Sequence, residues 1–121
     1  MPCLDTNFLI DLARFRIDID EVKNLVGSCK FCTIDSVIKE LKRIASKRTE
    51  VAGDAMVALK LIELNNFEIM KTKERNADDA ILSLAEKNFI VATNDIELRR
   101  RLKDFKIETI YLRSKKHLAI K

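Results

Sequence analysis

Two periods of hydrophobic and polar residues alternate along this chain of 121 residues. Short apolar runs predict β-strands, and segments whose apolar residues recur every three to four positions predict amphipathic helices. The predicted strands are residues 1–4, 31–34, 67–70, 89–93 and 109–112, and the predicted helices lie near residues 7–15, 20–26, 37–45, 50–64, 77–87 and 97–103. Because strands and helices alternate, the pattern predicts βαβ units with a parallel sheet, and therefore an α/β fold.

The helix expected over residues 50–64 carries a long apolar stripe, formed by Val51, Ala55, Met56, Leu59 and Ile62. The stripe is larger than one small sheet is expected to cover, and exposed apolar patches mark interfaces. We therefore expect self-association through this helix, as in a homodimer. Residues 114–121 are expected to form a loose tail.

Composition narrows the class of protein to a compact globular domain. The chain is 47% hydrophobic and 35% charged, with two Gly and one Pro, which excludes a disordered or collagen-like protein. No apolar run approaches the roughly 20 residues that span a bilayer, and no leader pattern is present, so we expect a cytoplasmic protein with no membrane partner.

Cys29 and Cys32 lack a second pair that would complete a zinc site. Cys3 and Cys32 are expected to be buried in strands.

Two aspartates follow predicted strands. Asp5 comes directly after the strand at residues 1–4, and Asp95 comes just after the strand at 89–93. In open α/β sheets, ligands bind at the carboxyl ends of the strands. Either aspartate could instead cap the helix that follows it, because Asp is a preferred N-cap residue. A ligand-binding role and a capping role therefore both stay open.

Two further acidic residues lie on predicted helices. Asp78 has apolar residues three, four and seven positions ahead of it, so it lies on the core side of its helix, whereas Asp79 is turned about 100° away. A carboxylate on the core side needs compensation, although an acid in a first turn also interacts favourably with the helix dipole. Glu40 borders the apolar arc of its helix. The alternative for Glu40 is a solvated side chain or one paired with Lys.

No other catalytic chemistry is visible in the sequence. There is no Gly-x-Ser-x-Gly elbow and no Gly-rich phosphate loop, and the one histidine, His117, lies in the basic C-terminal segment. Oxygen ligands alone favour hard cations such as Mg²⁺ or Mn²⁺. We therefore interpret Asp5, Glu40, Asp78 and Asp95 as a site for a divalent cation.

Four short motifs contain these acids. They are LDTNFLID at residues 4–11, SVIKEL at 36–41, ADDAIL at 77–82 and VATND at 91–95. In order and spacing they resemble the motifs of the PIN-domain ribonucleases over the whole chain. The resemblance implies a three-layer α/β fold with a central parallel sheet of about five strands flanked by helices, in a single nuclease domain over residues 1–121.

The resemblance also implies a chemistry and the residues that perform it. PIN-like endoribonucleases cleave single-stranded RNA with one or two Mg²⁺ or Mn²⁺ ions and a metal-activated water. The implied catalytic residues are Asp5, Glu40, Asp78 and Asp95, and the implied metal ligands among them are Asp5, Asp78 and Asp95. The implied polar neighbours, which would orient ligands or water, are Thr6, Asn7, Asp79 and Thr93.

The implied partners depend on the subfamily. Size and single-domain form are similar to VapC toxins, which would imply an antitoxin protein as partner. The motif at residues 77–79 and the segment at 95–102 are similar to PIN nucleases that process ribosomal RNA, which would imply a ribonucleoprotein. The sequence leaves both open.

The C-terminal segment carries a large positive charge. Residues 95–121 hold nine Lys or Arg against four Asp or Glu, whereas residues 49–94 hold five against eight. Such a basic segment favours binding of a polyanion, here RNA. The predicted RNA-binding residues are Arg99, Arg101, Arg113, Lys115 and Lys116, with Arg100 interpreted as superficial. The alternative is a solvated helix face and tail.

Two other functions compete with a nuclease. A PIN-like module could bind RNA in a ribonucleoprotein without cutting it, although the complete set of four acids speaks against this. A receiver-like signalling domain also groups acids at strand ends. It needs a phosphate-accepting Asp after the third strand, near residues 71–73, and no Asp is present there.

Overall fold

The computed structural model describes residues 2–27, 30–72, 79, 90–113 and 117–120. Along the chain, the elements are β1 (Pro2–Leu4), α1 (Thr6–Arg14), α2 (Ile19–Val26), β2 (Cys32–Ile34), α3 (Asp35–Ala45), α4 (Glu50–Leu64), β3 (Glu68–Met70), β4 (Ile90–Ala92), α6 (Ile96–Asp104), β5 (Thr109–Arg113) and β6 (His117–Ile120). The predicted strands are all present within one or two residues. Except for Asp79, the helix predicted over 77–87 lies outside the described residues.

The strands form one six-stranded sheet in the order β3-β2-β1-β4-β5-β6. The first five strands in this order are parallel, and β6 pairs with β5 in the antiparallel direction. The predicted α/β fold is confirmed, but the sheet is mixed and has one strand more than expected. The prediction of a loose tail was wrong for His117–Ile120, because this segment returns along β5 and covers an edge that would otherwise be unpaired.

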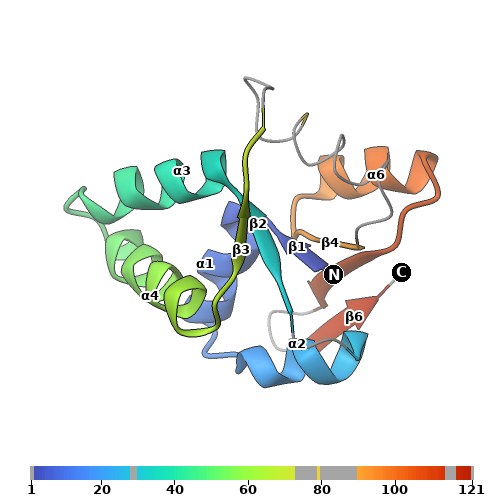
Figure 1. The fold of residues 1–121 in the computed structure, drawn as a ribbon, viewed down its shortest axis with the longest axis horizontal. Coiled ribbons are helices and arrows are strands. Elements are labelled where there is room, and N and C mark those ends of the chain that lie inside the picture. Colours follow the sequence, from blue (N-terminus) through green and yellow to red (C-terminus); the bar gives the residue numbers. More distant parts are fainter. Residues whose placement is uncertain (1, 28–29, 73–78, 80–89, 114–116, 121) are drawn as a thin grey trace.

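The strand β1 lies in the middle of the sheet, between β2 and β4 (Figure 1). Leu4 of β1 is in register with Ala92 of β4, and Cys3 is in register with Cys32 of β2. The strands that follow β1 in sequence are placed first on one side of it, as β2 and β3, and then on its other side, as β4 and β5. The gap between the ends of β1 and β4 is therefore the switch point at which open parallel sheets bind ligands.

The core lies against β1. Leu4, Phe8 and Leu9 are completely buried, and α1 packs against α4, which in turn pairs with α3. Cys3 and Cys32 are both buried free cysteines, as predicted. The hydrogen bond to Cys32 and burial raise the pKa of Cys3 well above the ordinary thiol value, so Cys3 stays a neutral core side chain. In the described part of the chain, none of the helices is both long enough and apolar enough to cross a membrane.

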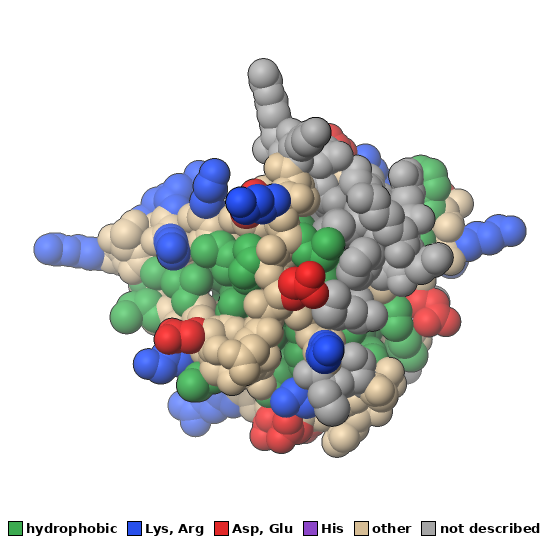
Figure 2. Space-filling model, viewed as in Figure 1, with side chains coloured by type: hydrophobic (Ala, Val, Ile, Leu, Met, Phe, Trp, Pro, Cys, Tyr) green, Lys and Arg blue, Asp and Glu red, His purple; other side chains and the backbone are tan. Residues whose placement is uncertain are grey.

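The predicted apolar stripe of α4 is only partly correct. Ala55 and Ile62 are buried, together with Ala58, but Val51 and Met56 are 39% and 61% exposed. Because α4 is apolar on nearly all sides, its pattern does not define a single face. Figure 2 shows hydrophobic side chains gathered over α3 and α4, and Val57 and Leu64 are among the exposed ones on α4.

Three helices end in the same way although none has a glycine at its C-terminal end. Arg16, Asn66 and Lys106 each have a positive φ of 50° to 58° just after α1, α4 and α6. The next residue donates its N–H back to a carbonyl five positions earlier, as in Ile17 to Leu12 at 2.9 Å, Phe67 to Ile62 at 3.1 Å and Ile107 to Leu102 at 3.0 Å. This is the Schellman motif, which closes a helix end and returns an apolar residue to the core.

The two glycines give a matched test of these local structures. Gly27 ends α2 with φ 65°, whereas Gly53 lies inside α4, and an added Cβ would meet no atom within 4 Å at either position. We predict that Gly27→Ala lowers the free energy of unfolding by about 1 kcal/mol, because L-residues are strained at positive φ. Gly53→Ala should raise it by roughly 0.5 to 1 kcal/mol, because Ala favours a helix. Urea denaturation measures both, and equal effects would contradict the assignment.

Candidate active site

Asp5 is placed by β1 at the switch point. Its backbone N–H donates to the Ala92 carbonyl of β4 at 3.0 Å, and its Oδ1 accepts the N–H of Phe8 at 2.8 Å. Asp5 is therefore the N-cap of α1, the alternative that the sequence left open. Capping does not explain why the residue is only 6% exposed, because an N-cap functions equally well in solvent and a buried carboxylate is costly. The two roles are compatible.

Thr6 connects this strand end to Glu40. Thr6 is buried at the start of α1, and its hydroxyl donates to Oε2 of Glu40 at 3.1 Å. Glu40 is half-buried in the second turn of α3, which confirms its expected position at the border of the core. The hydrogen bond joins Glu40 to the residue that follows Asp5, although 34 residues separate Thr6 and Glu40. Asn7, by contrast, is exposed on α1.

The residues after β4 complete the other side of the switch point. Thr93 is fully buried, and its Oγ1 accepts the N–H of Asp95 at 3.1 Å. Asp95 is half-buried and caps α6, because its Oδ1 accepts the N–H of Leu98 at 3.0 Å. Since Thr93 is level with Asp5 in the β1–β4 register, both strand ends present a carboxylate to the same edge of the sheet.

Asn94 and Asp11 form a bridge that sequence reasoning missed. The Asn94 amide donates to Oδ2 of Asp11 at 2.7 Å and accepts the N–H of Leu112 at 2.7 Å. This one side chain therefore ties the end of β4 to α1 and to β5. The available signal was weak: Asp11 is the one acid on α1.

A second missed contact lies at the ends of β2 and β3. The Asp35 carboxylate accepts hydrogen bonds from the Thr72 hydroxyl at 3.1 Å and from the Ser36 N–H at 2.9 Å. Burial raises the pKa of Asp35, but the hydrogen bonds from Thr72 and Ser36 and the charge of Lys39 outweigh it, so this pKa is lower than the ordinary value. Asp35 therefore stays charged at neutral pH and holds the ends of β2 and β3 together.

The acids of the third motif are only partly described. Asp78 lies outside the described residues, and Asp79 is exposed and forms an ion pair with Arg101 at 3.3 Å. Within residues 2–27, 30–72, 79, 90–113 and 117–120, no three Asp, Glu, Cys or His side chains could together hold a metal ion. A metal centre with three such ligands would therefore need at least one of them from outside this part of the chain.

The predicted RNA-binding residues have different surroundings. The Arg99 guanidinium lies over the ring of Tyr111, with Cζ 3.6 Å from the ring centroid. Arg101 points elsewhere, to Asp79. Arg113 is the last residue of β5, and Lys115 and Lys116 lie outside the described residues. Arg99 and Arg101 were both predicted to bind RNA, but in the structure they contact different residues, Tyr111 and Asp79.

Comparison with known proteins assigns the chain to a family. A family model described as a PIN like domain matches residues 3–115. The chain therefore belongs to the PIN-domain family, and the predicted resemblance to PIN-domain ribonucleases is confirmed.

The individual relatives span almost the whole chain. Ribonuclease VapC4 of Methanocaldococcus jannaschii is 35% identical over 122 aligned positions, covering 96% of this chain and 92% of the relative. Ribonuclease VapC9 of Archaeoglobus fulgidus is 33% identical over 119, covering 97% and 86%. The structure of the PIN domain endonuclease Utp24 matches with a TM-score of 0.80 and 23% identity, over 99% of this chain and 90% of that one. This last likeness shows the shared fold.

Asn94 offers a test of how the site is held. We predict that Asn94→Ala lowers the free energy of unfolding by about 1 to 3 kcal/mol, because it leaves the Leu112 N–H and the Asp11 carboxylate without their partner. Asn24→Ala, on the exposed side of α2, is the matched control and should change stability by less than about 0.5 kcal/mol. Thermal melting of both variants is the measurement. A wild-type melting curve for Asn94→Ala would show that the bridge does not stabilise the fold.

Proposed function

We propose that this protein is a metal-dependent endoribonuclease that cleaves phosphodiester bonds of single-stranded RNA with an activated water, as a toxin-type nuclease. The observation that carries the proposal is the buried carboxylate of Asp5 at the switch point of the sheet, bonded through its backbone to the strand that leads to Asp95. Two relatives named as ribonucleases, 33% to 35% identical over nearly the whole chain, support it.

The donor chemistry of this edge fits a hard divalent cation, Mg²⁺ or Mn²⁺. Asp5 and Asp95 are carboxylates at neighbouring strand ends, Thr6 and Thr93 add hydroxyl oxygens, and neither of the described cysteines lies among them. Asp78 is the residue that we propose as the third ligand. When bound, such an ion lowers the pKa of a coordinated water and stabilises the leaving oxygen.

The chain's own residues position the reacting groups. The Thr6 hydroxyl donates to one oxygen of Glu40 at 3.1 Å, which ties that carboxylate to the start of α1, directly after Asp5 in the sequence. Glu40 can then orient a water or take a proton from it. The caps of α1 and α6 hold Asp5 and Asp95 in single orientations, since each uses Oδ1 for a backbone N–H. Asn94 prevents the strand end that carries Asp95 from moving away from α1.

A non-catalytic RNA-binding module is the second candidate. It is favoured by one observation: Asp5 and Asp95 both have a structural duty as helix caps, which accounts for an acid at each position without a metal. In that case the protein would bind RNA but not cut it with any divalent ion.

Substitution of Asp78 separates the two candidates. We predict that Asp78→Asn reduces Mg²⁺- or Mn²⁺-dependent RNA cleavage by at least about 100-fold, because a ligand should matter at least as much as an outer-shell residue. The fold should be retained or become more stable without metal, because one of several repelling carboxylates is removed.

The matched control is Asp79→Asn, which removes the exposed ion pair with Arg101. It should keep most of the activity. Cleavage of a labelled single-stranded RNA, followed on a gel, is the readout for both variants, with thermal melting to show that they are folded. Full activity of Asp78→Asn would assign Asp78 to the helix dipole alone.

We further propose two protein partners, a second copy of the chain and an antitoxin-type protein. For the homodimer, the exposed Met56, Val57 and Leu64 of α4 are the surface we propose to be covered. For the antitoxin, a neighbouring small gene whose product inhibits cleavage would support the toxin role. Its absence would favour RNA processing in a ribonucleoprotein.

The homodimer gives a direct prediction. Val57→Asp together with Leu64→Lys should shift the protein to a monomer in multi-angle light scattering, because charges on α4 oppose burial of this surface. Phe105→Ser is the control: Phe105 is 59% exposed but lies at the end of α6. It should leave the oligomeric state unchanged. A monomeric wild-type protein at all concentrations would reject the proposal.

A further inference from the structure

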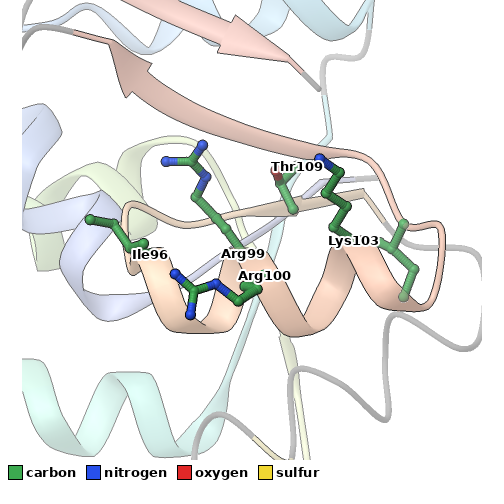
Figure 3. Close-up of a pocket in the computed structure, with 6 residues that line it drawn as sticks. Ile96, Arg99, Arg100, Lys103 and Thr109 are labelled. Atoms are coloured by element: carbon green, nitrogen blue, oxygen red, sulfur yellow. The ribbon is translucent and has the colours of Figure 1, made fainter.

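A basic pocket lies along α6, the helix that Asp95 caps. It has a volume of 280 Å³ and is lined by Ile96, Arg99, Arg100, Lys103, Ile107 and Thr109. Figure 3 shows Arg99 and Lys103 extending from α6 in the same direction, toward the side on which Thr109 lies, with Arg100 between them along the helix. Three cations thus share one pocket with a hydroxyl and two apolar side chains.

Arg99 is held in place inside this pocket. Its guanidinium stacks on Tyr111 at 3.6 Å, which fixes its plane. Among the described residues, the Arg99 Nε is the buried side-chain polar atom that has no hydrogen-bond partner. A buried donor without an acceptor costs free energy, so this group is better satisfied when an oxygen-rich ligand enters.

Among the described residues, the three cations of the pocket have no ion-pair partner. In the described part of the chain, ion pairs join Lys23 to Asp20 and Arg101 to Asp79, and none involves Arg99, Arg100 or Lys103. Arg101 belongs to the same helix but points to Asp79 instead of into the pocket. The positive charge of α6 is therefore divided between a paired cation outside the pocket and a group of unpaired cations inside it.

The pocket lies close to the candidate active site. The Arg99 N–H donates to the Asp95 carbonyl at 2.9 Å, so Arg99 is one helical turn from Asp95, and Lys103 is one turn further. At 1.5 Å per residue, these positions are about 6 and 12 Å from Asp95 along the helix axis. A ligand in the pocket would be too far away to react, but it could belong to the same strand as the reacting group.

We infer that this pocket binds a backbone phosphate of the RNA strand, next to the nucleotide that is cleaved. Arg and Lys side chains with unpaired donors are typical phosphate ligands, and the apolar Ile96 and Ile107 can pack against a sugar. The identity of the ligand as RNA rests on the proposed function, whereas the phosphate chemistry rests on the pocket. Arg100, whose sequence context suggested a purely superficial role, lines the proposed binding site.

The test compares substitutions inside and outside the pocket. Four proteins are titrated into a fluorescein-labelled single-stranded RNA in metal-free buffer at several salt concentrations. They are the wild type, the double variant Arg100→Gln/Lys103→Gln, the single variant Arg99→Gln and the control Arg101→Gln. Arg100 and Lys103 are exposed, so the double variant should fold normally. Thermal melting checks this, and Arg99→Lys tests whether charge without the planar guanidinium is enough.

The expected result is weaker RNA binding that is confined to the pocket variants. The slope of log affinity against log salt should fall by about 0.7 for each phosphate that the variant no longer binds, whereas Arg101→Gln should keep the wild-type slope. Arg99→Lys should lie between Arg99→Gln and the wild type. At saturating RNA with Mg²⁺ or Mn²⁺, the pocket variants should retain kcat and show a higher KM, because the pocket contributes uniform binding.

Two outcomes would overturn the inference. One is an unchanged affinity and salt slope in the folded pocket variants. The other is an equally weakened affinity in Arg101→Gln, which would indicate a general charge effect. If the wild type binds RNA through the pocket but cuts no RNA with either ion, the proposed nuclease function fails while the pocket assignment stands. If the wild type cuts RNA and the pocket variants bind RNA normally, the pocket assignment fails while the proposed nuclease function stands.

Discussion

The parallel register of β1 between β2 and β4 is the constraint on which the rest of the structure depends. It puts Asp5 at the same edge of the sheet as Thr93 and Asp95, although about 90 positions separate them in the sequence. A slip of one residue would exchange the two faces of β1. Leu4 and Cys3, which are completely buried, would then lose their packing. The hydrophobic core therefore fixes the position of the carboxylates.

Two acids of the candidate site are held by the helices that they cap. Asp5 and Asp95 each cap a helix with one oxygen, and the helix in turn keeps the carboxylate from rotating. Side chains that are held this way lose little freedom when they bind a ligand, which favours binding. The cost is that charge is concentrated in a half-buried region. Hydrogen bonds such as that between Thr6 and Glu40 and polar bridges such as that between Asn94 and Asp11 keep the region together.

Much of the fold could be predicted from the sequence, because strand and helix periods differ and most elements have a clear apolar side. The element order and the burial of Cys3 and Cys32 followed from the pattern. The ends of α1, α4 and α6 did not, because they use Arg16, Asn66 and Lys106 at positive φ where glycine is the usual signal. The strand β6 was missed because its short apolar run follows Ser114, Lys115 and Lys116, so that the whole segment reads as a polar, basic tail.

The site could be predicted only as far as single motifs allow. Motif spacing indicated Glu40, and the hydrogen bond from Thr6 joins it to the residue that follows Asp5. The contact between Asn94 and Asp11 joins positions 83 residues apart, and only the folded sheet brings them together. Similarly, the different surroundings of Arg99 and Arg101 depend on which side of α6 faces β5. A run of three arginines in the sequence does not show which of them is on that side.

The antiparallel strand β6 has a consequence for how the chain can be handled. Ala119 pairs with Tyr111, the residue on which Arg99 stacks, so β6 makes β5 an interior strand at that point. A chain cut before His117 would leave β5 as an open edge, which is a template for pairing with other molecules. Removal of these few residues would thus expose an unpaired strand edge next to the basic pocket. Aggregation of the shortened protein through this edge could then be mistaken for a functional oligomer.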